Sequence, residues 1–141
     1  MEICVMTRIN IIPVEELFDQ HLIAEYREIT MVPAALKRTL NSKNGLDESK
    51  INSQYILNQG HVYFFYNKGK YLDKRYKEII KEMKIRGFNP DPKRKFPKHI
   101  FMDNNFYKDW SPSIEDLKII QKRIASKLKE KPNWYRKTKY L

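Results

Sequence analysis

The chain has 141 residues, which suits one domain with a moderate core and is too short for two comfortable ones. Its 28 basic against 17 acidic side chains give a formal net charge of +11, which favours a polyanionic partner, nucleic acid above all, over an acidic small molecule. The single cysteine, Cys4, excludes a disulfide framework and a thiolate zinc site, and the lack of a membrane-length apolar run or a signal peptide indicates a soluble intracellular protein.

The first predicted element is a long helix that starts at Pro13, a residue suited to the first helical turn. Apolar residues then recur at intervals of three and four up to Val32. Pro33 is expected to kink or end the helix near Val32, and the helical pattern can continue from Leu36 to Leu40. This region is therefore interpreted as one long, kinked helix.

The middle of the chain is predicted to pass from a loop into a second helix. Residues 41–53 are polar and contain the turn signal Asn44-Gly45. The aromatic segment 60–66 has the composition of a strand, but it has no evident partner strand and is interpreted as a buried segment leading into a helix. From 70 to 86 apolar residues line one face and lysines fall elsewhere, which predicts an amphipathic helix ended at Gly87.

The last part of the chain is predicted to hold a long loop, a third helix and a basic tail. Residues 89–112 contain four prolines and indicate an ordered loop. Ser113 can cap a third helix, which is expected to stop before Pro132. Residues 61–141 hold 22 of the 28 basic side chains and 9 of the 17 acidic ones. This excess fits nucleic-acid binding, or alternatively an ordinary solvated surface.

A candidate nucleophile lies near the N-terminus. Thr7 follows Met6, and threonine is small enough for an initiator methionine in front of it to be trimmed, which leaves a free α-amine. Such an amine has a pKa of about 8, so part of it is neutral at physiological pH and can attack a sugar carbon to form a Schiff base. Residues 1–5 precede Met6, and a peptide-bonded nitrogen cannot react in this way. Translation from Met6, or processing that exposes Thr7, would supply the amine.

Several ordered motifs of the chain match a known family, and the likeness runs from Met6 to the C-terminal aromatic residues. The motifs are Thr7-Arg8-Ile9-Asn10, Asp19-Gln20-His21-Leu22, Ala24-Glu25-Tyr26-Arg27-Glu28, Gly60-His61-Val62, Phe64-Phe65-Tyr66, Arg86-Gly87-Phe88-Asn89 and Pro132 with Trp134-Tyr135. With these motifs at this spacing, the chain resembles the pyrimidine-dimer DNA glycosylases with abasic-site lyase activity.

The resemblance implies a fold and a reaction. The fold is all-α, a single compact domain over residues 1–141, with residues 1–5 as an extension or alternative start. It has three main helices, long ordered loops and an N-terminal segment threaded between the first and third helices. The α-amine of Thr7 attacks the sugar of the 5′ pyrimidine in a cyclobutane dimer, and the resulting imine leads to β-elimination of the strand. Glu28 matches the catalytic carboxylate, which stabilises the cationic sugar and moves protons.

The resemblance also implies the partners. The substrate is double-stranded DNA with UV-induced pyrimidine dimers, bound by a monomer without a membrane, a cofactor or a metal ion. His21, Glu25 and Glu28 share a helical face, but no other histidine has ligand-like spacing, so no metal site is predicted. The residues assigned to DNA binding are Arg8, Gln20, His21, Arg27, Arg123, Lys127, Trp134 and Tyr135.

Alternatives remain open at several of these positions. His21 can instead be a buried, hydrogen-bonded histidine, and Trp134 and Tyr135 can simply pack in the tail. Met31 occupies a position at which the phage enzyme of the family has a phosphate-binding arginine, so DNA affinity or strand geometry can differ. If the N-terminus stays blocked, the chain is a damaged-DNA-binding protein without catalysis; a related lesion or an abasic site is another possible substrate.

Overall fold

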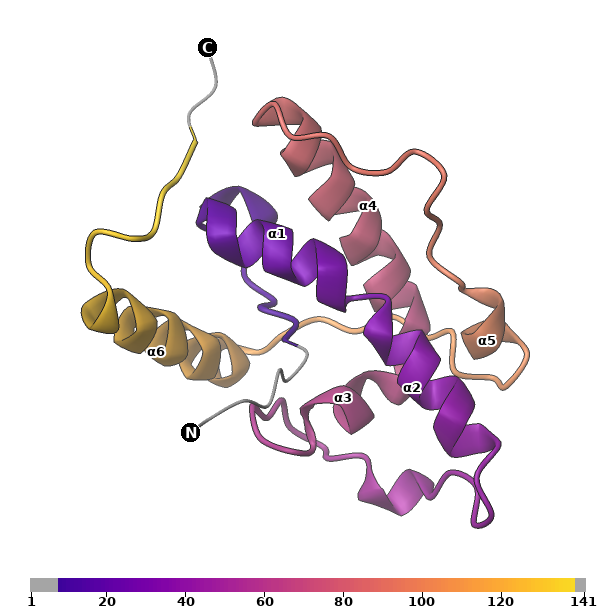
Figure 1. Ribbon diagram of the computed structural model, residues 1–141. Helices are drawn as coiled ribbons and strands as arrows, with labels where there is room; N and C mark the ends of the chain where they lie inside the picture. The colour runs from indigo at the N-terminus through magenta and orange to yellow at the C-terminus, as the bar shows by residue number, and fades with distance from the viewer. Residues whose placement is uncertain (1–7, 139–141) are drawn as a thin grey trace.

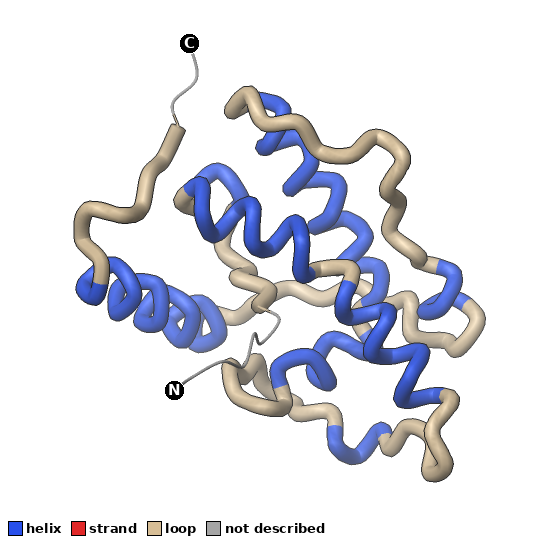
Figure 2. The backbone as a smooth tube through the Cα atoms, viewed as in Figure 1, coloured by secondary structure: helices blue, strands red, loops and turns tan. Residues whose placement is uncertain are grey.

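The computed structural model describes residues 8–138, and in that range it consists of helices and loops without a strand (Figures 1 and 2). The prediction of an all-α fold is confirmed. No helix among the described residues is long and apolar enough to cross a membrane. The longer helices are α1 (Asp19–Glu28), α2 (Met31–Leu40), α4 (Gly69–Ile85) and α6 (Ile114–Glu130). The short helical elements are η1 (Val14–Glu16), η2 (Glu48–Lys50), α3 (His61–Phe64), η3 (Phe65–Asn67) and α5 (His99–Met102).

The predicted single helix from Pro13 to Leu40 is instead two helices, α1 and α2, and the first of them starts later than predicted. The described residues therefore form four main helices rather than three. Pro13 precedes the 3-10 turn η1, and extended backbone at Phe18 (φ −69°, ψ 156°) delays the α-helix to Asp19. The break lies at Ile29-Thr30 and not near Pro33. Pro33 falls in the first turn of α2, where the amide hydrogen that proline lacks would have no helical partner.

The remaining helices follow the sequence prediction closely. Helix α4 ends at Ile85, and Gly87 follows with φ 87°, a left-handed conformation that favours glycine. Ser113 caps α6 in a capping box, in which its hydroxyl accepts the Asp116 N–H at 3.1 Å and the Asp116 carboxylate accepts the Ser113 N–H at 2.9 Å. The aromatic segment 60–66 is helical, and the loop 89–112 contains the single turn α5.

The N-terminal segment, residues 8–13, runs through the interior. It enters between α1 and α6 in Figure 1, and Ile11 borders the same groove as Leu117 of α6. Ile9 is fully buried, and Ile11 and Ile12 belong to the same hydrophobic cluster as Leu22 of α1. Helix α1 packs on α4 beside this segment. The threading that the family resemblance implied is therefore present in the described residues.

Candidate active site

A buried ion pair between α1 and α4 holds the N-terminal segment. Arg75 donates from Nε to Glu25 Oε2 at 2.6 Å and from Nη2 to Glu25 Oε1 at 3.1 Å, and the two side chains are 3% and 0% exposed. Glu25 Oε1 also accepts the backbone and side-chain N–H groups of Asn10 at 3.0 and 2.9 Å. Arg75 Nη1 donates to the Ile12 carbonyl. Burial alone would lower the pKa of Arg75, but the Glu25 carboxylate raises it above its ordinary value.

His61 and Tyr55 bind the backbone of Ile9 from the other side. His61 Nε2 accepts the Ile9 N–H at 2.8 Å, so the ring hydrogen is on Nδ1, which donates to the Ile56 carbonyl at 2.7 Å. Burial lowers the pKa of His61 to about 4, which keeps the ring neutral at physiological pH. Tyr55 donates its hydroxyl hydrogen to the Ile9 carbonyl at 2.7 Å. Glu25, Tyr55, His61 and Arg75 are called the cradle below.

Glu28 lies where the N-terminal segment enters the cradle. The backbone N–H of Arg8 donates to Glu28 Oε1 at 3.0 Å. Burial raises the pKa of Glu28, and the Arg8 hydrogen bond together with the charges of Arg8 and Arg123 opposes that rise. Thr7, the predicted nucleophile, lies outside the described residues. The structure thus places the predicted carboxylate beside the residue that follows Thr7.

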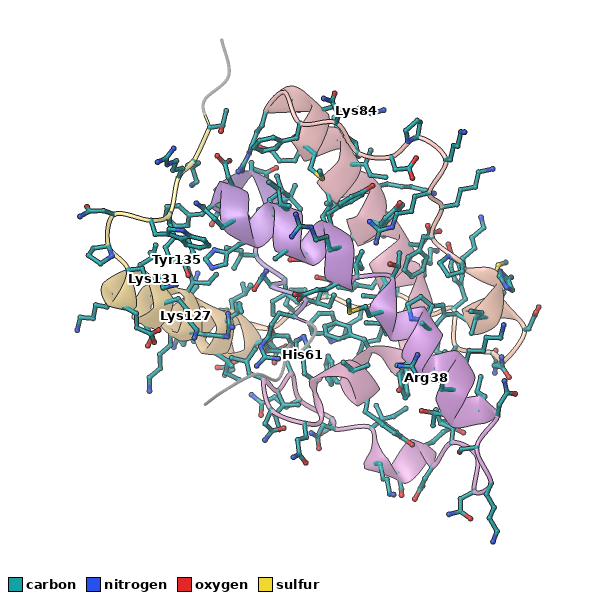
Figure 3. The ribbon with its side chains drawn as sticks, viewed as in Figure 1. Arg38, His61, Lys84, Lys127, Lys131 and Tyr135 are labelled. Carbon is teal, nitrogen blue, oxygen red and sulfur yellow. The ribbon has the colours of Figure 1, made fainter. Side chains whose placement is uncertain are left out.

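A cleft of about 300 Å³ lies between α1, which carries Glu28, and α6 with the C-terminal tail. The His21 and Tyr135 rings form one stacked pair, with centroids 4.8 Å apart and planes at 24°. Burial lowers the pKa of His21 to about 4, and the charge of Arg123 adds to this effect. Figure 3 shows Lys127, Lys131 and Tyr135 near one another by the C-terminal part of α6. The residues that line the cleft are His21, Arg123, Lys127, Glu130, Lys131, Trp134 and Tyr135.

The part of the chain that builds the cradle also matches a known protein family. A family model for pyrimidine dimer DNA glycosylase matches residues 6–96. The chain belongs to the pyrimidine dimer DNA glycosylase family. The match covers the N-terminal segment and the four cradle residues, whereas α6 and the tail follow the matched range. Family membership makes DNA repair the role of this glycosylase and damaged DNA its substrate.

Three predicted DNA-binding residues of this glycosylase, Arg8, Gln20 and Arg27, are not among the residues that line the cleft. Gln20 uses both ends of its amide on the tail: Nε2 donates to the Trp134 carbonyl at 2.6 Å, and Oε1 accepts the Arg136 N–H at 3.0 Å. Arg27 is exposed in the last turn of α1. Gln20 therefore fixes the tail that carries the aromatic residues of the cleft.

The cradle is the part of the glycosylase site that the sequence analysis missed. Only Arg75 could have been noticed from the pattern of the sequence, because it interrupts the apolar face of α4 between Leu72 and Ile79. A charged residue on such a face requires a buried partner. His61 belongs to the motif Gly60-His61-Val62, but that motif gave it no role, and Tyr55 left no comparable signal. Within residues 8–138 no group of three or more His, Cys, Asp or Glu side chains could hold a metal ion.

Proposed function

We propose that the chain is a bifunctional DNA repair enzyme, a glycosylase with abasic-site lyase activity, that uses the α-amine of Thr7 and the carboxylate of Glu28. The observation that carries this proposal is the 3.0 Å hydrogen bond from the Arg8 N–H to Glu28 Oε1. The Arg8 nitrogen is bonded to the carbonyl carbon of Thr7, and three covalent bonds separate it from the α-nitrogen of Thr7. That nitrogen therefore lies within about 4 Å of the Arg8 nitrogen.

The reaction begins with attack of the neutral amine on C1′ of the 5′ pyrimidine nucleotide in a cyclobutane dimer. The N-glycosyl bond breaks and its electron pair leaves with the base, which takes up a proton. Loss of a proton from the attacking nitrogen and opening of the sugar ring give an imine. Removal of a C2′ proton then expels the 3′ phosphate by β-elimination, and water hydrolyses the imine to release the enzyme.

Glu28 serves this reaction in two ways. Its carboxylate stabilises the cationic sugar that forms as the glycosyl bond breaks. Its pKa is raised, and so lies closer to neutral pH than the pKa of an ordinary glutamate. Such a pKa suits a group that accepts and returns protons during imine formation and elimination. The partial burial that raises the pKa also strengthens the electrostatic interaction with the sugar.

The cleft between α1, α6 and the tail supports binding of double-stranded DNA by cations and aromatic rings together. Arg123 and Lys127 line it from α6, and Trp134 and Tyr135 line it from the tail. The charge of Arg8 also acts on Glu28. Cationic side chains bind phosphates of any sequence, and the aromatic rings can contact the distorted bases of a lesion. A damaged base pair also costs less to unstack than an intact one.

The amine mechanism requires Thr7 to be terminal. The family match begins at Met6, which supports the interpretation of residues 1–5 as an extension that translation from Met6 omits or that processing removes. If residues 1–5 stay attached, the Thr7 nitrogen is an amide. The rival function is then damaged-DNA binding without catalysis.

Imine trapping tests the proposal directly. Two versions of the protein, one starting at Met1 and one at Met6, are incubated with borohydride and a duplex that contains one cyclobutane thymine dimer, and mass spectrometry identifies the mature N-terminus. A covalent protein–DNA adduct is expected only where Thr7 is terminal. Retained binding without an adduct from either version would overturn the enzyme assignment in favour of the binding protein. Competition by an abasic-site duplex then decides which lesion is preferred.

A further inference from the structure

We propose that the loop of residues 91–98 is a second phosphate-binding surface, which extends the DNA interface past the C-terminal end of α1. The inference rests on the proposed function for the identity of the partner. Four of the eight loop residues are basic and one, Asp91, is acidic. The basic residues are Lys93, Arg94, Lys95 and Lys98.

Arg94 brings this charge to the edge of the active site. Its guanidinium lies 4.3 Å from the ring centroid of Tyr26 and 5.6 Å from that of Tyr76. Its Nη2 donates to the Arg27 carbonyl at 3.2 Å and to Thr30 Oγ1 at 2.5 Å. Arg27 precedes Glu28 in the chain, so Arg94 is fixed next to the last turn of the helix that carries the catalytic carboxylate.

The loop is anchored before any DNA binds. The Tyr26 hydroxyl accepts the Asp91 N–H at 2.8 Å, and Asp91 Oδ1 accepts the Lys93 N–H at 2.9 Å. The Tyr76 hydroxyl donates to the Arg94 carbonyl at 3.3 Å, and Phe96 is buried in the core. These contacts tie the loop to α1 and α4. Cations on a fixed backbone lose less conformational freedom when they bind phosphates than cations on a mobile loop.

The basic side chains of the loop form no salt bridge in the described part of the chain, although Asp91 lies in the same loop. None of the salt bridges within residues 8–138 includes Lys93, Arg94 or Lys95. A cation that only caps the C-terminal end of α1 would explain the bond from Arg94 to the Arg27 carbonyl. It would not explain the exposed lysines on either side of Arg94. A phosphate backbone passing the end of α1 accounts for all three.

The salt dependence of binding tests this surface. The affinity for an undamaged duplex is measured by fluorescence anisotropy over a range of salt concentrations. The double variant Lys93→Ala/Lys95→Ala is expected to reduce the slope of log K against log salt concentration by about two, with affinity about eightfold lower per lost contact at roughly 0.1 M salt. The matched control is Lys81→Ala/Lys84→Ala, which removes two exposed lysines of α4. Lys81 borders a groove together with the acidic residues Glu15 and Glu78, a setting that does not favour phosphate binding.

The outcomes separate the proposal from its alternatives. If the loop double variant and the control have equal slopes of log K against log salt concentration, the proposal that residues 91–98 bind phosphates is wrong. Arg94→Gln is expected to reduce the slope by about one, and Arg94→Lys, which keeps the charge, to restore it. Equal slopes for Arg94→Gln and the wild type would remove Arg94 from the interface. Binding of undamaged DNA needs no amine chemistry, so the result is readable whether or not imine trapping succeeds.

Discussion

Two glutamates three residues apart on α1 have different partners, which suits different tasks. Glu25 accepts hydrogen bonds from both nitrogens of Asn10 and from Arg75, so its oxygens are committed to holding the N-terminal segment. Glu28 is half-buried and accepts the Arg8 N–H. Within residues 8–138 it therefore stands outside the hydrogen-bond network of Asn10 and Arg75. This difference supports the assignment of catalysis to Glu28 and of positioning to Glu25.

Replacing Glu28 by glutamine should separate binding from chemistry. Glu28→Gln keeps the shape of the side chain and can still accept the Arg8 N–H, but it removes the negative charge that stabilises the cationic sugar. We expect strand cleavage at a dimer to fall by about 100-fold or more, with affinity for damaged DNA changed little. Single-turnover cleavage and anisotropy measure the two quantities. Near-normal cleavage by this variant would rule out the proposed role of Glu28.

His61 should make the stability of the fold sensitive to acid. Its pKa is about 4 in the folded protein and 6.5 without burial, so between these values the unfolded chain binds a proton that the folded chain does not. The free energy of unfolding therefore falls as pH decreases from 6.5 to 4, by about 3 kcal/mol from this residue. Urea unfolding at a series of pH values measures the effect.

A variant at the same position isolates this contribution. His61→Gln removes the titrating ring and keeps one acceptor and one donor for Ile9 and Ile56. We expect its pH dependence to be shallower than that of the wild type between pH 6.5 and 4, with the remainder coming partly from His21, whose pKa is also about 4. Identical pH dependence in both proteins would show that His61 does not need to stay neutral for the fold.

The motifs singled out Glu28 as the proposed catalytic residue, whereas the pairings that hold the N-terminal segment were not predicted, for a physical reason. Glu25 and Glu28 belong to one short motif and His61 to another, and the spacing within each motif is visible along the chain. The pairs that hold the N-terminal segment join distant positions: Glu25 contacts Arg75, and Ile9 contacts His61. Nothing in helical periodicity specifies which buried charge meets which. Such pairing is decided by tertiary packing.

At the scale of elements, a helix boundary was predicted correctly where a strong local signal marks it. Helix α6 begins at a capping box, and α4 ends before a glycine in a left-handed conformation. The break between α1 and α2 was placed three residues too late because Ile29 and Val32 are both fully buried and continue the apolar pattern. The pattern records which residues are buried, and burial persists across a turn that interrupts the helix.

The tail is an element that side chains of α1 hold in place. Gln20 binds the tail backbone at Trp134 and Arg136, and Asp19 accepts hydrogen bonds from the backbone and hydroxyl of Thr138. These bonds keep the aromatic residues of the tail over the cleft. The energy of each bond is modest, because they lie near the solvent.

Freeing the tail should weaken DNA binding without stopping chemistry. Gln20→Ala removes both amide contacts, so Trp134 and Tyr135 must be ordered again when DNA binds. We expect a dissociation constant a few-fold higher, by roughly 1 kcal/mol, and an unchanged cleavage rate at saturating protein. Gln121→Ala, an exposed glutamine on α6, is the matched control. An unchanged dissociation constant for Gln20→Ala would show that the tail does not need this clamp.

At the scale of the whole molecule, charge and chemistry come from different parts of the sequence and meet in the fold. The motif with the proposed catalytic residues lies in the first 60 residues, and 22 of the 28 basic side chains lie in residues 61–141. Threading of the N-terminal segment between α1 and α6 places Glu28 within the electrostatic influence of Arg123. The overall charge of +11 favoured a polyanionic partner over an acidic small molecule, whereas the influence of Arg123 on Glu28 could be seen only in the fold.

Arg123 should therefore contribute both affinity and salt dependence. With about four to eight phosphate contacts, log K for duplex DNA is expected to fall with log salt concentration with a slope of about −4 to −7. Arg123→Ala removes one contact and should make that slope less steep by about one. Lys122→Ala, which removes the same charge from the neighbouring exposed position of α6, is the control. An unchanged slope for Arg123→Ala would place this arginine outside the DNA interface and would assign the cleft between α6 and the tail to a role other than phosphate binding.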